Sequence, residues 1–285
     1  MLPERFSIYP FASVLSNPYA SANKEKTMDI HDKLWLWTHV AGGVNNQYGF
    51  KEGSKISPAE AASYMGISNI IFVRLNNKPD VPEYGKYAGS FKKLDRVVWS
   101  IIGDSASSNE SEAPALLDLS GKFPNICGVI MDDFFTFRVN AYKPQDIASI
   151  RRSLSSRTEA GRSLDLWVTL YTHELDMPVK PYLDECDVTT LWTWHSENLA
   201  FLETNFAKLK KMCPSSRKIL GCYMYDFGNS KPMQAELMEK QCRFGLDLLR
   251  SGEVEGIIFL ASCICDLNLD SVEWTKKWIQ KNRNG

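Results

Sequence analysis

The chain has 285 residues, of which 44% are hydrophobic and 24% are charged, a composition typical of a globular protein with a large core. Its 33 Lys and Arg residues nearly balance 34 Asp and Glu residues, which leaves a net charge of -1. This balance argues against a nucleic-acid partner or an anionic membrane surface. Since no apolar run approaches the roughly 18 residues of a membrane span, we also expect no membrane insertion.

The N-terminal segment does not have the pattern of a signal peptide, because residues 1–20 contain no basic stretch followed by an apolar one. Localisation therefore stays open, and a chain that had lost a signal peptide before this point would be secreted or periplasmic. We expect residues 1–30 to pack across the bottom or the side of a single domain formed by residues 31–285.

Eight apolar stretches recur along the chain and are rich in Val, Ile, Trp and Tyr, which favour strands. They cover residues 34–40, 69–75, 96–104, 126–135, 165–174, 187–195, 218–228 and 256–266. Their apolarity is nearly continuous rather than alternating, which is typical of parallel strands buried on both faces.

Segments with helical patterns separate most of these stretches. Ser57, Pro58 and Glu60 form a capping box and predict the start of a helix. Apolar spacing and stop signals predict further helices over residues 197–212, 231–252 and 270–281. Residues 76–95 contain several Pro and Gly residues and predict a loop with at most a short helix.

Strands alternating with helices in this way predict an α/β fold, a single-domain (β/α)8 TIM barrel with parallel strands. An open doubly wound sheet is the competing fold, and it usually carries Gly-x-Gly-x-x-Gly after its first strand. Here the first strand is followed by VAGGVNNQYG (40–49), which does not fit that pattern. The seven cysteines are odd in number and lack a Cys-x-x-Cys motif, which favours free core thiols over disulfides or a zinc site.

In such a barrel the functional groups gather at the C-terminal ends of the strands. Titratable or aromatic side chains end every predicted strand. In chain order they include His39, Arg74, Asp104, Asp132, Asp133, His173, Glu174, Trp194, His195, Tyr225, Asp226 and Asp266.

Asp132 and Asp133 follow a buried strand directly, and three phenylalanines follow them within the next four positions. Adjacent like charges repel, and burying either one without a partner is costly, so the pair indicates a functional role. Because side chains alternate along a strand, we expect one acid to face the site and the other to support it. We favour Asp133 as the direct catalyst.

Carboxylates around one cleft suit glycosidic hydrolysis, in which one acid protonates the leaving oxygen and a second attacks the anomeric carbon or activates water. The sequence predicts Asp226 as the second carboxylate, with Glu174 as the reserve candidate. The predicted substrate-binding residues are His39, Arg74, Trp99, Asp104, His173, Trp194, His195 and Tyr225.

The stretches GVIMDDFF (128–135) and GCYMYDFG (221–228) resemble the ends of strands four and seven in (β/α)8 glycoside hydrolases, where catalytic acids commonly lie. The resemblance implies a glycosidase with a carbohydrate substrate. The common strand-four signatures, Asn-Glu in one large clan and Asp-x-Asp-x-Glu in the chitinase-like group, are both absent, so no single family is indicated. Since no motif has metal-ligand spacing, we expect no required metal and no cofactor.

Two other functions stay open. A metal-dependent hydrolase or sugar isomerase could use His39, His173, His195, Glu174 and Asp266 as ligands. A non-catalytic carbohydrate-binding barrel would use the aromatic side chains to bind and the acids only to form hydrogen bonds. Metal content separates the first function from a glycosidase, and activity on a glycan panel separates the second.

Overall fold

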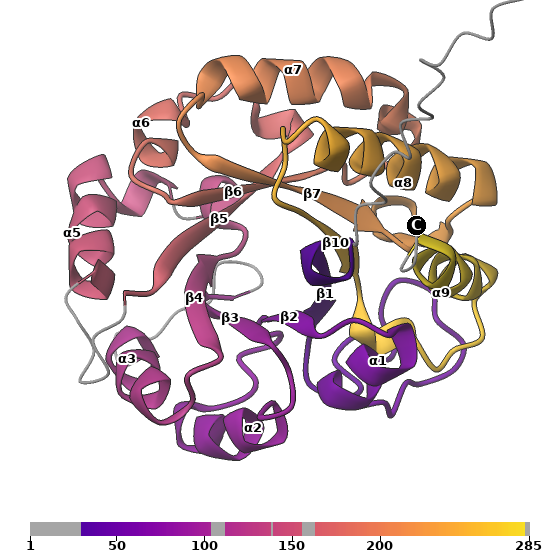
Figure 1. Ribbon diagram of the computed structural model, residues 1–285, viewed down its shortest axis with the longest axis horizontal. Coiled ribbons are helices and arrows are strands. Elements are labelled where there is room, and N and C mark those ends of the chain that lie inside the picture. The colour runs from indigo at the N-terminus through magenta and orange to yellow at the C-terminus, as the bar shows by residue number, and fades with distance from the viewer. Residues whose placement is uncertain (1–29, 104–111, 138, 156–162, 283–285) are drawn as a thin grey trace, which may run out of the picture.

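The computed structural model describes residues 30–103, 112–137, 139–155 and 163–282. Eight parallel strands close into a barrel in the order β1-β10-β7-β6-β5-β4-β3-β2, and helices surround it (Figure 1). The strands are β1 (Leu34–Thr38), β2 (Asn69–Phe72), β3 (Arg96–Ile102), β4 (Ile126–Met131), β5 (Asp165–Tyr171), β6 (Val188–Trp192), β7 (Arg217–Tyr223) and β10 (Gly256–Leu260). The predicted (β/α)8 barrel is confirmed.

Most helices lie between consecutive strands, whereas η1 precedes β1 and η8 and α9 follow β10. The α-helices are α1 (Pro58–Met65), α2 (Tyr84–Ser90), α3 (Glu112–Lys122), α4 (Phe134–Phe137), α5 (Pro144–Ser155), α6 (Lys180–Leu183), α7 (Leu202–Met212), α8 (Ala235–Arg250) and α9 (Asp270–Asn282). The short 3-10 helices are η1 (His31–Lys33), η2 (Val81–Glu83), η4 (Val139–Ala141), η5 (Thr172–Glu174), η6 (Ser196–Phe201), η7 (Phe227–Asn229) and η8 (Ser262–Ile264). No helix in the described part of the chain is both long and apolar enough to cross a bilayer. The predicted packing of the N-terminal extension falls on residues 1–29, outside the described residues.

Local sequence signals place several helices correctly. The Ser57 side chain accepts a hydrogen bond from the Glu60 backbone amide, and the Glu60 side chain accepts one from the Ser57 backbone amide. Gly66 ends α1 in the left-handed conformation. Residues 76–95 contain only η2 and the short helix α2, as predicted. In the predicted helix 197–212, the first turns form η6 and only Leu202–Met212 is α-helical.

The strands are shorter than the apolar stretches that predict them. β4 ends at Met131, and the following phenylalanines form the short helix α4. β7 ends at Tyr223, beyond which Tyr225–Asp226 (β8) pairs antiparallel with Lys231–Pro232 (β9). The extra apolar residues are buried in the loops above the barrel, so their composition does not distinguish loop from strand.

Tryptophans fill the barrel interior, and glycines on neighbouring strands make room for them. The Trp35 and Trp167 rings meet edge to face at 5.0 Å between centroids. A Cβ on Gly221 would lie 2.2 Å from the Trp192 ring, and one on Gly128 would lie 3.0 Å from the Trp167 indole nitrogen. Pairing large with small residues in this way is how a barrel interior reaches core density.

The seven cysteines are free thiols, and six of them are buried. Burial raises the pKa of Cys127 to about 11 and that of Cys263 to about 12, so both stay protonated near neutral pH. They therefore behave as small hydrophobic core residues.

Candidate active site

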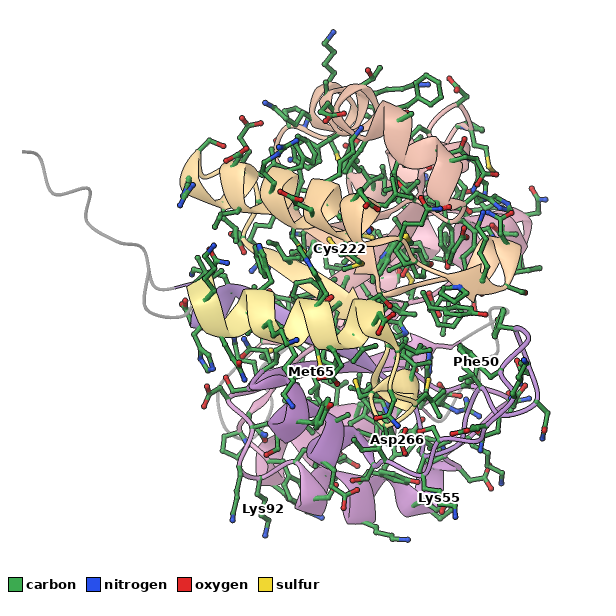
Figure 2. All side chains as sticks on the ribbon, turned by 90° about the vertical axis from the view of Figure 1, so that its right-hand side faces the viewer. Phe50, Lys55, Met65, Lys92, Cys222 and Asp266 are labelled. Atoms are coloured by element: carbon green, nitrogen blue, oxygen red, sulfur yellow. The ribbon has the colours of Figure 1, made fainter. Side chains whose placement is uncertain are left out.

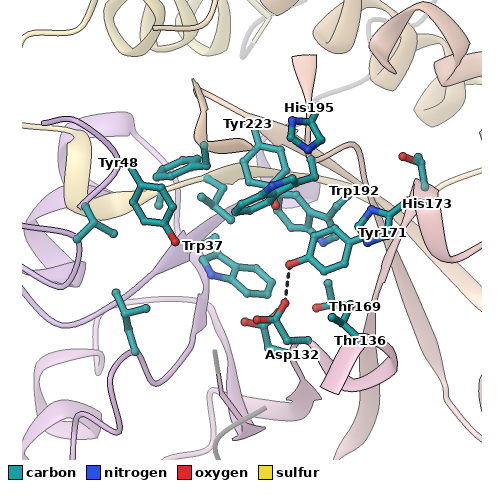
Figure 3. Close-up of a pocket in the computed structure, with 18 of the residues that line it drawn as sticks. Trp37, Tyr48, Asp132, Thr136, Thr169, Tyr171, His173, Trp192, His195 and Tyr223 are labelled. Atoms are coloured by element: carbon teal, nitrogen blue, oxygen red, sulfur yellow. Dashed lines mark hydrogen bonds between the residues drawn. The ribbon is translucent and has the colours of Figure 1, made fainter. Parts of the chain in front are cut away.

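A cavity of about 610 Å³ opens at the C-terminal ends of the barrel strands (Figure 3). Four side chains at its base are at most 2% exposed: Trp37, Thr169, Trp192 and Tyr223. Its lining also includes Tyr48, Asp132, Asp133, Thr136, Phe137, Tyr171, Trp194 and three histidines, His39, His173 and His195. The cavity is therefore both acidic and aromatic.

Asp132 and Asp133 both line this cavity, so the expectation that only one of them would face the site is wrong. The cause is the backbone at Asp133, where φ is +52°. This left-handed conformation ends the alternation of the strand and turns two consecutive side chains toward the same space. Such a conformation is uncommon outside glycine and collects at functional sites.

Tyr171 and Tyr223 surround the two acids with neutral phenols. The Tyr171 hydroxyl donates a hydrogen bond to Asp133 Oδ1 at 2.8 Å (Figure 3). Burial, reinforced by the neighbouring carboxylates, raises the pKa of Tyr171 and of Tyr223 well above the ordinary tyrosine value. Both hydroxyls therefore keep their protons near neutral pH and can act as hydrogen-bond donors.

The loop between β1 and α1 carries Tyr48 to one side of the cavity. Asp266, just after β10, holds this loop because it accepts hydrogen bonds from the backbone amides of Lys55 and Ile56 at 2.8 and 3.1 Å (Figure 2). The Tyr225 hydroxyl donates to the Tyr48 carbonyl oxygen at 2.8 Å. Tyr225 was predicted to bind substrate, but the structure places it behind the cavity wall, where it positions Tyr48.

Glu174 also stands behind the wall. It is 1% exposed and does not line the cavity, whereas Thr136 does and donates a hydrogen bond to Glu174 Oε1 at 2.5 Å. The Glu174 Oε2 accepts from the Tyr171 backbone amide at 2.8 Å. Burial raises the pKa of Glu174 above its ordinary value, although these hydrogen bonds oppose the rise. Glu174 thus fixes two cavity residues from the outside.

Two histidines and a tryptophan form the rim on the β5 and β6 side. The His173 ring stacks on Tyr171 at 5.4 Å between centroids, and Trp194 meets Tyr171 edge to face. Burial, assisted by His195, lowers the pKa of His173, so this ring is neutral near pH 7. A Cβ on Gly228 would come within 2.6 Å of His195 Nδ1, so only glycine leaves room for this ring.

His39 is buried in the cavity wall at the end of β1. Its Nδ1 donates to the Val73 carbonyl oxygen at 2.9 Å, which leaves Nε2 as an acceptor. Burial lowers the pKa of His39 to about 4, although the hydrogen bond to Val73 partly opposes that shift.

The lowered pKa of His39 predicts a loss of stability in mild acid. Between about pH 6.5 and pH 4 the unfolded chain binds a proton at His39 that the folded chain does not, so the free energy of unfolding falls as the pH falls. The contribution lost is up to about 3 kcal/mol. Urea unfolding at several pH values across this window measures it, and the His39→Asn variant should show a flatter dependence. An unchanged slope in the variant would contradict the prediction.

Three further predicted residues lie elsewhere. Arg74 forms a buried ion pair with Glu112 and donates to the Asn77 carbonyl oxygen at 3.1 Å, without lining the cavity. Trp99 is fully buried and packs on Phe72 outside the cavity, at 4.8 Å between ring centroids. Asp104 lies outside the described residues.

Asp226 is not brought to the cavity that Asp132 and Asp133 line. Its carboxylate is fully buried and accepts from the Asn229 backbone amide at 3.2 Å and from the Asn229 side chain at 2.9 Å. Burial alone would raise the pKa of Asp226, but hydrogen bonds from Ser196 and Asn229, with nearby Lys231, lower it below the ordinary value. In this position the carboxylate caps η7.

Replacing Asp226 with asparagine should therefore lower stability rather than turnover. The amide would point a donor at another donor, so we expect a loss of about 1–3 kcal/mol in the free energy of unfolding. Chemical unfolding and activity per folded molecule measure the two effects separately. A variant with wild-type stability and no activity would instead support the catalytic role predicted from the sequence.

Several cavity residues were missed by the sequence interpretation. Trp37, Thr169, Trp192 and Tyr223 line the cavity but are not among the predicted site residues. The signal was present: side chains two positions before a rim residue share its face, as Trp37 does with His39 and Trp192 does with Trp194.

No group of three His, Cys, Asp or Glu side chains within the described ranges is arranged to hold a metal ion. No protein-family model matches the sequence, and no curated protein is similar enough in sequence to match it.

Solved structures with a similar fold include a xylanase-amylase inhibitor protein, at 13% identity and a TM-score of 0.58, covering 87% of this chain and 98% of that one. An endo-α-mannosidase from Bacteroides thetaiotaomicron is 10% identical with a TM-score of 0.51 over 89% and 98% of the two chains. A chitinase from Chromobacterium violaceum is 9% identical with a TM-score of 0.51 over 88% and 98%.

These likenesses show the shared fold. The molecule is a (β/α)8 barrel with an acidic and aromatic cavity at the C-terminal ends of its strands.

Proposed function

We propose that this protein is a glycoside hydrolase whose working carboxylates are Asp132 and Asp133. The observation that carries the proposal is that both acids line one cavity together with Trp37, Trp192 and Trp194. Aromatic faces suit the C–H faces of a sugar ring, and carboxylates suit acid–base chemistry at a glycosidic bond.

Asp133 is the proposed proton donor to the leaving oxygen. Tyr171 holds its Oδ1 from the side of β5, so the carboxyl group has a fixed orientation. As the glycosidic C–O bond breaks, positive charge develops on the ring carbon, and the Asp132 carboxylate in the same cavity would stabilise it. Water then bonds to that carbon, and the proton it loses returns to the carboxylate pair.

Substrate binding in this proposal uses neutral groups around the two acids. Tyr223 supplies a hydroxyl donor and His39 Nε2 supplies an acceptor, while the Tyr171 hydroxyl keeps its bond to Asp133. Phe137, which lines the mouth and is 57% exposed, offers an apolar ring to a bound glycan. These features support a carbohydrate substrate.

A non-catalytic carbohydrate-binding barrel is the second candidate. It is favoured by one observation: among the described residues, both carboxylates of the cavity come from the end of β4, and none faces them from the opposite wall. Hydrolysis usually places its two carboxyl groups on either side of the scissile bond. The inhibitor protein of similar fold shows that a barrel of this shape also serves a binding role in another protein.

A panel of p-nitrophenyl glycosides and polysaccharides, assayed for released phenol or reducing ends with and without EDTA, tests the proposal. Cleavage that is insensitive to EDTA supports it. Cleavage that disappears with EDTA and returns with zinc or manganese would support a metal-dependent enzyme instead. Binding of glycans without cleavage of any of them would support the binding barrel.

A further inference from the structure

Thr169 is a buried polar residue at the base of the cavity. On β5 the side chains of Trp167, Thr169 and Tyr171 share one face, because side chains alternate along a strand. Trp167 packs on Trp35 inside the barrel, and Tyr171 reaches Asp133 at the mouth. Thr169 therefore faces the barrel axis between these two levels, and it lines the cavity.

The Thr169 hydroxyl is buried without a partner. The residue is 2% exposed, and its Oγ1 makes no hydrogen bond with any described residue. Two buried threonines on other strands differ: Thr38 on β1 donates to the Ile71 carbonyl oxygen at 3.0 Å, and Thr190 on β6 donates to the Val168 carbonyl oxygen at 3.3 Å. A buried hydroxyl without a partner is unfavourable, so its presence at a cavity wall calls for a ligand atom as its partner.

We propose that Thr169 is a specificity-determining residue that hydrogen-bonds one ring hydroxyl of the sugar bound at the base of the cavity. This inference rests on the proposed function, since it takes the cavity occupant to be a sugar. Trp37 and Trp192 contact the apolar face of the sugar ring, and the Thr169 hydroxyl recognises the position of one ring hydroxyl by hydrogen-bonding it. A site built to hydrogen-bond a hydroxyl discriminates strongly against an analogue that lacks it.

The experiment uses three variants of the full chain: Thr169→Val, Thr169→Ser and Thr193→Val. Thr193 is a matched control, because its hydroxyl is also buried without a partner in the described structure but does not line the cavity. The probes are the methyl glycosides of D-glucose, D-galactose, D-mannose and N-acetyl-D-glucosamine. Their binding is measured by the change in tryptophan fluorescence. The tightest probe is then compared with its monodeoxy analogues.

We expect wild type to bind one monodeoxy analogue about tenfold more weakly than its parent sugar. Thr169→Val should bind the parent about tenfold more weakly and no longer distinguish that analogue, whereas Thr169→Ser and Thr193→Val should behave like wild type. Without ligand, Thr169→Val should unfold at the same temperature as wild type or a few degrees higher, because it removes an unpaired hydroxyl.

Three results would overturn the inference: wild-type binding by Thr169→Val, a lower unfolding temperature for Thr169→Val without ligand, or no binding of any probe to wild type. Its failure is distinct from failure of the hydrolase proposal. Cleavage of a glycan with an unchanged KM in Thr169→Val would reject the role of Thr169 and keep the hydrolase. Binding that depends on Thr169, without cleavage of any glycan, would keep the role of Thr169 and reject the hydrolase.

Discussion

Replacing Asp133 with asparagine is expected to lower turnover of a cleaved glycan by about 10²- to 10⁴-fold, the usual effect of removing an acid–base carboxylate. The fold should be unaffected, because asparagine has the same shape and tolerates the left-handed backbone that Asp133 adopts at φ +52°. Its amide oxygen can still accept the hydrogen bond from Tyr171. Steady-state kinetics with a thermal unfolding curve for each preparation measures both quantities.

The matched control for this experiment is Asp176→Asn. Asp176 is an exposed carboxylate beyond η5 that pairs with Lys208 at the surface and does not line the cavity. Its replacement should leave both turnover and unfolding unchanged. If Asp133→Asn unfolds many degrees lower while activity survives, Asp133 has a structural role and the hydrolase proposal fails.

Replacing Glu112 with glutamine is expected to lower the free energy of unfolding by roughly 3 kcal/mol, because it leaves the Arg74 guanidinium without its counter-ion. The two side chains are 0% and 6% exposed, so water cannot take over the role of the carboxylate. The ion pair joins the end of β2 to the start of α3. Urea unfolding at neutral pH measures the effect.

The exposed pair formed by Lys180 and Asp184 provides the comparison. Its side chains are 54% and 47% exposed, and such surface pairs contribute less than about 1 kcal/mol. Asp184→Asn should therefore have little effect. If Glu112→Gln costs no more than Asp184→Asn, the buried pair does not stabilise the fold as its burial indicates.

The apolar stretches and the helices between them were enough to predict the barrel. A stretch such as 69–75 is apolar on both faces, and few folds besides a parallel sheet covered by helices bury both faces of a strand. The capping box at Ser57 and Glu60 is equally local, since it depends only on residues three apart. The boundaries of β4 and β7 could not be predicted, because the phenylalanines and tyrosines after them are as apolar as the strands themselves.

The composition of the candidate site was predicted in part. Of the twelve predicted site residues, the cavity contains Asp132, Asp133, His39, His173, Trp194 and His195. Arg74, Glu174, Tyr225 and Asp226 lie outside the cavity because a polar residue after a strand end can turn toward the barrel axis or toward the surrounding helices and loops. Trp99 packs in the core, and Asp104 lies outside the described residues. Arg74 and Asp226 found partners on the outside, in Glu112 and Asn229.

By itself the sequence determined that this protein is a (β/α)8 barrel and that two adjacent acids follow its fourth strand. Both features depend only on the order of residues in the chain: the apolar pattern of the strands and the neighbouring positions of the two acids. Only the tertiary structure decided which side chains share the cavity. That choice depends on the left-handed backbone at Asp133 and on the hydrogen bond from Tyr171, 38 residues away in the chain. Contacts of this kind arise when the barrel closes, since closure brings the ends of distant strands to one rim.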